Sequence, residues 1–193
     1  YVNGNIAPKY YSDRLLRGGP LAQLPGSFYA GGGFNTDTRK KIWFNPYVNY
    51  NGYTGNESWS ASGGIYMETR PRSNLQLTFG PNYYKQYSTA QYVTGLADAT
   101  ATSTFGSRYV FADLHQATLS LDTRINWTLT PRLSLQSYLQ PFVAVGSYSA
   151  FKEFTTPRRY EFDVSGLERG TITANTNAQG QVTSYTIDPD GAG

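Results

Sequence analysis

Residues 118–129 read Thr-Leu-Ser-Leu-Asp-Thr-Arg-Ile-Asn-Trp-Thr-Leu, and this stretch decides the class of fold. Apolar side chains alternate with polar ones at a period of two, which is the pattern of a β-strand with one apolar and one polar face. A tilted strand needs about eleven residues to cross the hydrocarbon layer of a bilayer, and this stretch is long enough. The stretch therefore predicts a strand that could span a membrane.

A second apolar series follows the turn Thr130-Pro131-Arg132, at the odd positions from Leu133 to Val145. A three-residue turn would pair Leu129 with Leu133, and the same register would pair Trp127 with Leu135 and Leu119 with Val143. Both apolar series would then share one side of the sheet, and a slip of one residue would separate them.

A similar turn is expected at Arg70-Pro71-Arg72, because proline presets φ and is disfavoured within a strand. It would pair Met67 with Leu75, Ile65 with Leu77, Gly63 with Phe79 and Trp59 with Tyr83. A third short turn, at Asn35 to Arg39, would separate a strand over 27–34 from one over 41–51.

Longer polar connections are expected at 18–26, 52–58, 88–107 and after Ser147. Short and long connections alternate in outer-membrane barrels, with the short turns periplasmic and the long loops external. We predict an all-β, antiparallel, up-and-down transmembrane barrel that forms one domain over residues 1–193. Residues 168–193 would be external loop, with 170–174 and 182–187 paired as a small hairpin around Asn177-Ala178-Gln179-Gly180.

About six or seven spanning strands are visible, fewer than the eight of the smallest usual barrel. We therefore expect the chain to be a fragment whose closing strands lie elsewhere, in the same protein or in another chain.

Composition agrees with a membrane strand protein. Aromatic residues make up 16% of the chain and charged residues 15%, against about 25% charged in an average soluble domain. The mean hydropathy of −0.48 and the absence of any run of about 18 apolar residues exclude a transmembrane helix but not a barrel. The 16 basic residues are scattered, so nucleic-acid binding gains little support.

Several short segments resemble a bacterial family of unknown function, in which a carbohydrate-binding-like N-terminal domain precedes a C-terminal outer-membrane barrel. They are Asp13-Arg14-Leu15-Leu16-Arg17-Gly18-Gly19-Pro20, Gln91-Tyr92-Val93, Arg108-Tyr109-Val110-Phe111-Ala112-Asp113-Leu114, Thr118-Leu119-Ser120-Leu121-Asp122-Thr123-Arg124, Leu133-Ser134-Leu135-Gln136, Gln140-Pro141-Phe142 and Phe151-Lys152-Glu153. The resemblance covers about 13–193. It implies an outer-membrane location, further strands after Gly193 and a sugar-binding-like domain before Tyr1, and it carries no catalytic residues.

Alternation assigns side chains to a lumen face and a lipid face, and position near the strand ends assigns aromatic residues to interfacial girdles. The lumen would be lined by Asp122, Arg124, Asn126, Gln136 and Gln140, where the two charges either pair structurally or set solute selectivity. The lipid would be contacted by Leu119, Leu121, Ile125, Leu129, Leu135 and Val143. Interfacial girdles would be formed by Trp43, Trp59, Tyr83, Tyr109 and Trp127.

Other candidate sites carry weaker signals. The single histidine, His115, follows Asp113 at a spacing that suits a general-base pair, although an ordinary histidine at the rim is favoured. Tyr47, Tyr50, Tyr53 and Trp59 could stack on sugars, with a girdle role favoured. We read Gly31-Gly32-Gly33 as a strand bend or a place of close approach, not a phosphate loop.

With no cysteine and one histidine, no metal or cofactor site is expected. The favoured function is a non-enzymatic outer-membrane barrel that acts as a channel, a transport component or the anchor of a carbohydrate-binding-like domain, with the bilayer, envelope proteins or further barrel strands as partners. The alternatives are a barrel hydrolase using Asp113 and His115, and a soluble β-sandwich or calyx that binds an apolar ligand.

Overall fold

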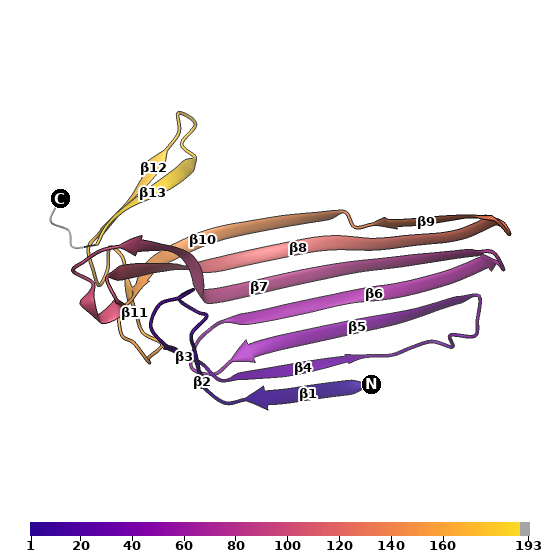
Figure 1. Cartoon of the computed structure of the whole chain (residues 1–193), viewed down its shortest axis with the longest axis horizontal. Coiled ribbons are helices and arrows are strands. Elements are labelled where there is room, and N and C mark those ends of the chain that lie inside the picture. The colour runs from indigo at the N-terminus through magenta and orange to yellow at the C-terminus, as the bar shows by residue number, and fades with distance from the viewer. Residues whose placement is uncertain (190–193) are drawn as a thin grey trace. The chain divides into compact units, whose positions relative to one another are not determined.

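The computed structural model describes residues 1–189 and is built from antiparallel β-sheets (Figure 1). The expected all-β class is confirmed: within those residues the helical structure is a single 3-10 turn, η1, at Thr102–Thr104. No helix in the described part of the chain is long and apolar enough to cross a membrane. The strands are β1 (Val2–Ala7), β2 (Tyr10–Ser12), β3 (Ala22–Leu24), β4 (Ser27–Gly33), β5 (Ile42–Tyr53), β6 (Trp59–Arg72), β7 (Leu75–Ala97), β8 (Ser107–Thr130), β9 (Leu133–Leu139), β10 (Phe142–Phe154), β11 (Phe162–Val164), β12 (Thr171–Thr176) and β13 (Val182–Asp188).

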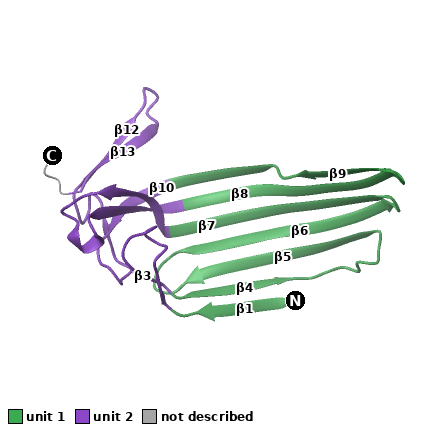
Figure 2. Cartoon of the chain, in the orientation of Figure 1, with its two compact units in different colours: residues 1–8, 26–88, 115–147 green, residues 9–25, 89–114, 148–193 purple. Residues whose placement is uncertain are grey.

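The chain divides into two compact units, coloured separately in Figure 2. Unit 1 comprises residues 1–8, 26–88 and 115–147, and unit 2 comprises 9–25, 89–114 and 148–193, of which 190–193 lie outside the described residues. The expected loop end at Asp190 to Gly193 therefore falls outside the description. Strands β7, β8 and β10 contribute residues to both units.

The main sheet has the strand order β1-β4-β5-β6-β7-β8-β10-β11, with β9 also paired to β8. The two smaller sheets, β2-β3 and β12-β13, belong to unit 2. No pairing joins β1 to the other end of this order among residues 1–189, so the sheet stays open. Residues 1–189 thus form antiparallel sheets, and no closed barrel is found among them.

Registers in unit 1 place the alternating residues on two chemically distinct faces. Tyr47 of β5 lies opposite Gly64 of β6, and Gly64 lies opposite Asn82 of β7. Their neighbours Val48, Gly63 and Tyr83 form the equivalent row on the other side. Because cross-strand partners share a face, the period-two pattern of each strand adds up to one polar and one apolar surface.

The turn expected at Arg70-Pro71-Arg72 is wrong. β6 continues to Arg72, the turn falls at Ser73 and Asn74, and a bulge between Thr69 and Arg72 accommodates Pro71. A bulge tolerates proline because its N–H is not needed by the ladder. The expected pairs therefore shift by four residues, to Met67–Phe79, Thr69–Leu77, Gly63–Tyr83 and Trp59–Tyr87. An even shift leaves every side chain on its expected face.

The turn after Thr130 is close to the expectation. Trp127 pairs with Leu135, as expected, but a bulge makes Thr130, not Leu129, the partner of Leu133. The expected continuous strand from Leu133 to Val145 is wrong, because it breaks into β9 and β10 at Gln140-Pro141. Proline cannot donate to the ladder, which explains the break.

The extent of the long connections was predicted unevenly. The turn expected at 35–39 lies within the connection 34–41, and the connection expected at 52–58 spans 54–58, so both connections are confirmed, but the one expected to be longer is the shorter of the two. The connection expected at 88–107 is wrong, because β7 runs to Ala97 and β8 begins at Ser107, and the connection expected after Ser147 is interrupted by the end of β10 and by β11. The loop expected at 18–26 contains β3, which pairs with β2.

Unit 2 has its own apolar core. Leu16, Tyr109, Phe111 and Phe154 are buried, and the ring of Phe162 packs against both Phe111 and Phe154. The hairpin expected near the end of the chain is confirmed: β12 pairs with β13, with Ile172 opposite Ile187.

Candidate functional site

The polar face of unit 1 is the richest candidate site in the described chain. We define it by the strand residues that the registers and direct contacts place on one side: Asn3, Asn5, Tyr29, Gly31, Gly33, Trp43, Asn45, Tyr47, Asn49, Asn51, Ser60, Ser62, Gly64, Tyr66, Glu68, Gln76, Thr78, Gly80, Asn82, Tyr84, Gln86, Gln116, Thr118, Ser120, Asp122, Arg124, Asn126, Gln136 and Tyr138. Amides, hydroxyls and phenols dominate it.

Tyrosine rings on this face lie over glycines of neighbouring strands. The Tyr47 hydroxyl would stand 2.8 Å from a Cβ on Gly64, and the Tyr1 hydroxyl 2.7 Å from a Cβ on Gly33. Tyr29 occupies the equivalent space at Gly31. Of the two expectations for the glycine run, a strand bend or a close approach, the structure shows the close approach.

Hydrogen bonds connect the amides and phenols across strands. Tyr29 donates to Asn49 (2.7 Å), and Asn49 donates to Ser62 (3.3 Å). Gln86 accepts from Tyr84 (2.6 Å) and donates to Gln116 (2.8 Å). These bonds hold the side chains in defined positions, and they use only part of the bonding capacity of each amide, which has two donor hydrogens and an oxygen with two lone pairs.

A pocket of about 380 Å³ opens where the polar face carries its central charges. Asp122 accepts a 2.8 Å hydrogen bond from the Tyr138 hydroxyl, and the Arg124 guanidinium lies 5.5 Å from the centre of the same ring. The structure thus brings together three of the five expected lumen residues. The lining residues are Tyr47, Ile65, Tyr66, Gln76, Thr78, Gly80, Pro81, Asp122, Arg124, Asn126 and Tyr138.

The remaining two expected lumen residues lie apart from this pocket. Gln136 is exposed on β9, opposite Asn126, and Gln140 is exposed in the break between β9 and β10. Sequence reasoning missed Tyr66 and Tyr138 as pocket residues, and of the four aromatic residues considered for stacking on sugars only Tyr47 lines this pocket. Each of these tyrosines lies an even number of residues from polar residues of its own strand, and this spacing predicts that they share a face. The spacing does not predict which residues of different strands lie close together.

The apolar face of unit 1 is widely exposed. The side chain of Val48 is 61% exposed, Leu119 58% and Val143 67%, whereas Glu68 on the polar face is only 6% exposed. Leu129 and Leu135 are also exposed, and Leu121 and Ile125 are half-buried. Contact of these six expected residues with lipid stays a prediction.

Aromatic residues expected in the girdles fall into different environments. Trp59 stacks on Tyr50 with parallel rings 6.5 Å apart, Tyr83 is exposed, and Trp127 shares the apolar face with Leu135. Trp43 lies on the polar face, against Tyr66.

Tyr109 does not fit a girdle position. It is 8% exposed and belongs to the core of unit 2. A ring in a girdle must reach the surface, so the girdle position expected for Tyr109 is wrong. The strand pattern around Tyr109 did not reveal that other segments cover it.

Asp113 and His115 have separate partners. The Asp113 carboxylate forms a 2.6 Å ion pair with Lys152 in unit 2. The His115 ring stacks on Tyr87 in unit 1, with centres 4.4 Å apart. These contacts direct the Asp113 carboxylate and the His115 ring to different neighbours.

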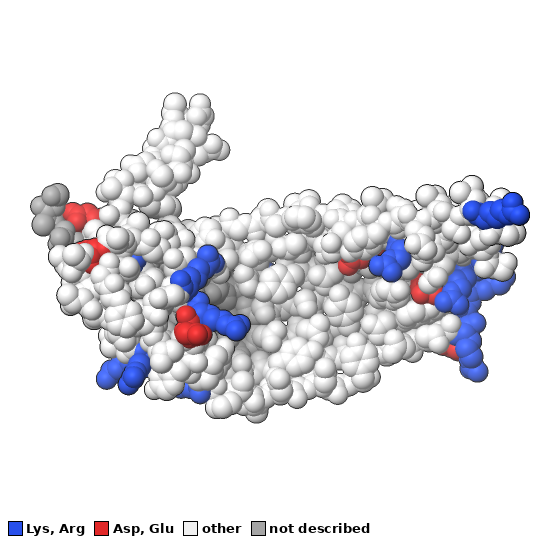
Figure 3. Space-filling model, viewed as in Figure 1, with Lys and Arg blue, Asp and Glu red and all other residues white. Residues whose placement is uncertain are grey.

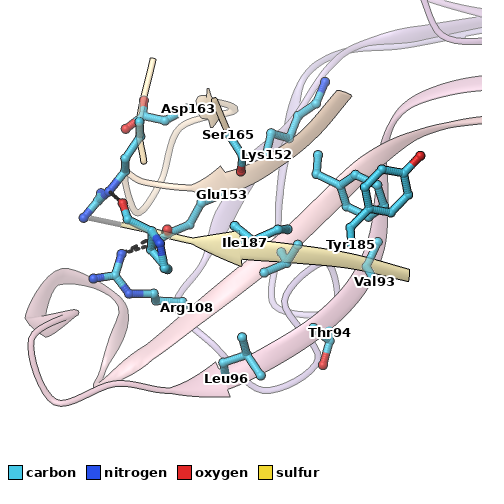
Figure 4. A pocket seen from close by; sticks show the side chains of 14 residues that line it. Val93, Thr94, Leu96, Arg108, Lys152, Glu153, Asp163, Ser165, Tyr185 and Ile187 are labelled. Atoms are coloured by element: carbon cyan, nitrogen blue, oxygen red, sulfur yellow. Dashed lines mark hydrogen bonds and ion pairs between the residues drawn. The ribbon is translucent and has the colours of Figure 1, made fainter. Parts of the chain in front are cut away.

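Unit 2 contains a cavity of about 450 Å³, seen from close by in Figure 4. Its walls are largely apolar, from Val93, Leu96, Tyr185 and Ile187. Arg108 donates to Glu153 (3.0 Å) at one side and also pairs with Asp98. These ion pairs place compensating charges around Arg108 next to the apolar walls.

Charged side chains are sparse over the strands of unit 1. In Figure 3 the blue and red residues on the visible face gather mainly toward the turn ends, and uncharged residues cover most of the strands between them. No group of three or more histidine, aspartate or glutamate side chains within residues 1–189 could hold a metal ion.

Comparison with known proteins finds no matching family model, no matching curated protein and no matching solved structure.

Proposed function

We propose that unit 1 is part of a non-enzymatic outer-membrane β-barrel that serves as a channel or transport component, with the apolar face toward lipid and the polar face toward an aqueous lumen. The observation that carries the proposal is that apolar side chains on one face of unit 1 are exposed, while polar side chains on the other face are buried. Side chains such as Val48 and Leu119 are exposed, while Glu68 and Thr78 on the opposite face are buried. A soluble sheet normally buries its apolar face, whereas a barrel strand in a membrane alternates apolar-out with polar-in.

Strand length supports the same proposal. β5 has 12 residues and β6 has 14, and a tilted strand needs about 9–11 to cross the hydrocarbon layer. Basic residues of unit 1 gather in the turns at one end of these strands, at Arg39, Lys40, Lys41 and Arg132. Lys85 is the exception on the apolar face, and it is flanked on that face by Tyr83 and Tyr87, as expected near an aqueous boundary.

The open edges of the sheet also favour a barrel that other strands complete. β1 forms one edge of unit 1, and β9 and β10 form the other. Exposed apolar edge strands pair readily with further strands, and a spanning sheet needs every backbone group satisfied. The resemblance to a family with a C-terminal barrel points in the same direction, and it keeps the role of anchor for a sugar-binding-like domain as an alternative.

The test uses single cysteines, because the chain contains none of its own. Val48→Cys and Asn49→Cys are introduced separately into the whole protein, produced in a Gram-negative host, and labelled with a nitroxide in a reconstituted bilayer. We expect the label at residue 48 to be accessible to oxygen, which concentrates in lipid, and the label at residue 49 to be accessible to a water-soluble nickel complex. Leu119→Cys and Ser120→Cys provide a matched second pair on β8.

Equal accessibility at both members of each pair would overturn the lipid-facing assignment. Extraction of the envelope separates the alternatives: a detergent-dependent protein that migrates differently when boiled supports the barrel, and a soluble protein supports the sandwich or calyx. Single-channel recording then separates a channel from a closed anchor.

A further inference from the structure

The polar face of unit 1 is almost free of net charge. The residues that define this face include two acidic side chains, Glu68 and Asp122, and one basic side chain, Arg124, and Arg70 lies just beyond them near the end of β6. Arg70 pairs with Glu68 at 2.9 Å, while Asp122 and Arg124 both contact Tyr138. Pores that select ions use rings of one charge sign, and these mixed pairs do not provide such a ring.

The amides of this face offer donors and acceptors side by side. Asn126 and Gln76 line the pocket around Asp122, and Asn82 lies opposite Gly64 in the next row. A vicinal diol needs an acceptor and a donor at short separation, which a carboxamide supplies from one planar group. The distribution of amides therefore suits a solute that carries many hydroxyl groups.

Three tyrosines complete the pocket. Tyr47, Tyr66 and Tyr138 line it together with Asp122, Arg124 and Asn126, and its volume of about 380 Å³ lies in the range of small-molecule sites, about 300–1,000 Å³. A phenol ring offers an apolar surface with a polar tip, which can contact the C–H face of a ring sugar while its hydroxyl bonds at the edge. Aromatic surface combined with amides, one carboxylate and one guanidinium matches a neutral polyol better than an ion or a purely apolar molecule.

We infer that the pocket formed by Tyr47, Tyr66, Asp122, Arg124, Asn126 and Tyr138 is a binding site for a neutral, hydroxyl-rich solute, the chemistry of a saccharide. Asp122 is held by Tyr138 with its second oxygen available as an acceptor, and the Arg124 and Asn126 side chains supply donors. The inference rests on the proposed function in one respect, that the polar face lines a water-filled lumen. The pocket itself would bind its ligand in any folded form of the protein.

The experiment measures binding directly, by saturation-transfer NMR and equilibrium dialysis with sucrose, a neutral disaccharide, on the whole protein in a detergent without sugar groups. The variants are Tyr138→Leu and Asn126→Leu, and the control is Leu139→Ala, which changes the neighbouring residue on the other face. We expect sucrose binding in the wild type and in the control, and a loss of affinity of about tenfold or more in both pocket variants.

Potassium gluconate and glucosamine hydrochloride, as an anionic and a cationic polyol, test the charge argument. Preference for either one over sucrose would overturn the inference, as would absence of sucrose binding to folded wild type. Variants whose gel migration changes on boiling as in the wild type are folded. If Tyr138→Leu does not fold, Asn126→Leu and the more conservative Tyr138→Phe still test the inference.

The two proposals fail separately. A soluble protein that binds sucrose would contradict the membrane barrel and leave the polyol site standing. A detergent-dependent, heat-modifiable protein that binds no neutral polyol would contradict the site and leave the barrel standing.

Discussion

Tyr47 reaches across an entire strand to Asn82. The two residues lie on β5 and β7, in line with Gly64 of β6 between them, and the Tyr47 hydroxyl donates a 2.9 Å hydrogen bond to Asn82 Oδ1. The ring passes over the glycine, which has no Cβ to obstruct it. This hydrogen bond thus bridges three paired strands, and it depends on the absence of a side chain at Gly64.

Gly64→Ala is expected to destabilise the protein by about 1–3 kcal/mol, because the new Cβ would lie 2.6 Å from the Pro81 carbonyl oxygen and 2.8 Å from the Tyr47 hydroxyl. Urea unfolding of the reconstituted protein measures the change. Gly63→Ala is the matched control, since its Cβ would meet its nearest neighbour at an ordinary 3.4 Å. Equal effects of the two substitutions would rule out the crossing tyrosine as the cause.

Arg108→Met is expected to cost about 3 kcal/mol, because it leaves Asp98 and Glu153 without their cation where the arginine side chain is 9% exposed. Arg159→Met is the control. Its ion pair with Glu161 is largely exposed, and its loss should change the free energy of unfolding by about 0–1 kcal/mol. A small effect of Arg108→Met on the free energy of unfolding would show that solvent screens the cluster formed by Asp98, Arg108 and Glu153.

Acid should weaken the ion pair between Asp98 and Arg108 over a defined pH range. Hydrogen bonds from Thr100 and Arg108 lower the pKa of Asp98 from 3.8 to about 2. A carboxyl with a lowered folded-state pKa contributes its stability above the unfolded value, so the contribution is fully present above about pH 4 and disappears as the pH falls through about 2. The pH dependence of unfolding should therefore flatten between these values in Asp98→Asn. Glu57→Gln, in an exposed turn, serves as the reference, and an unchanged slope in Asp98→Asn would contradict the assignment.

Leu121→Arg tests the proposed lipid contact at a position on the apolar face that follows from the alternation of β8. A charge toward lipid near the middle of the bilayer should cost about 2–4 kcal/mol, whereas Ser120→Arg, on the polar face, should cost much less. Folding efficiency into lipid vesicles and urea titration report the difference. Insertion of both variants with equal stability would be inconsistent with lipid contact at Leu121.

Alternation along the strands was readable from the sequence because it is local. The side chains of 118–129 occupy opposite faces at a period of two whatever the strand pairs with, and the pairing of Trp127 with Leu135 followed from a short turn. The two-faced character of the sheet and the shared face of Asp122, Arg124 and Asn126 were predicted in this way.

Turn positions were less predictable, because two signals competed. Proline at Pro71 suggested a turn, but Ser73 and Asn74 take the turn and a bulge absorbs the proline. The result depends on the register of the whole β6–β7 pair, so no local rule reveals it.

The sequence by itself determined the strand periodicity, the all-β class and the separation of polar from apolar side chains, since these depend on neighbours within one strand. Only the tertiary structure decided which residues meet: that Tyr47 crosses Gly64 to Asn82, that Tyr138 holds Asp122, and that Tyr109 lies in the core of unit 2. Such contacts join residues distant in the chain, and they follow from strand order, register and the packing of covering segments, which periodicity does not specify.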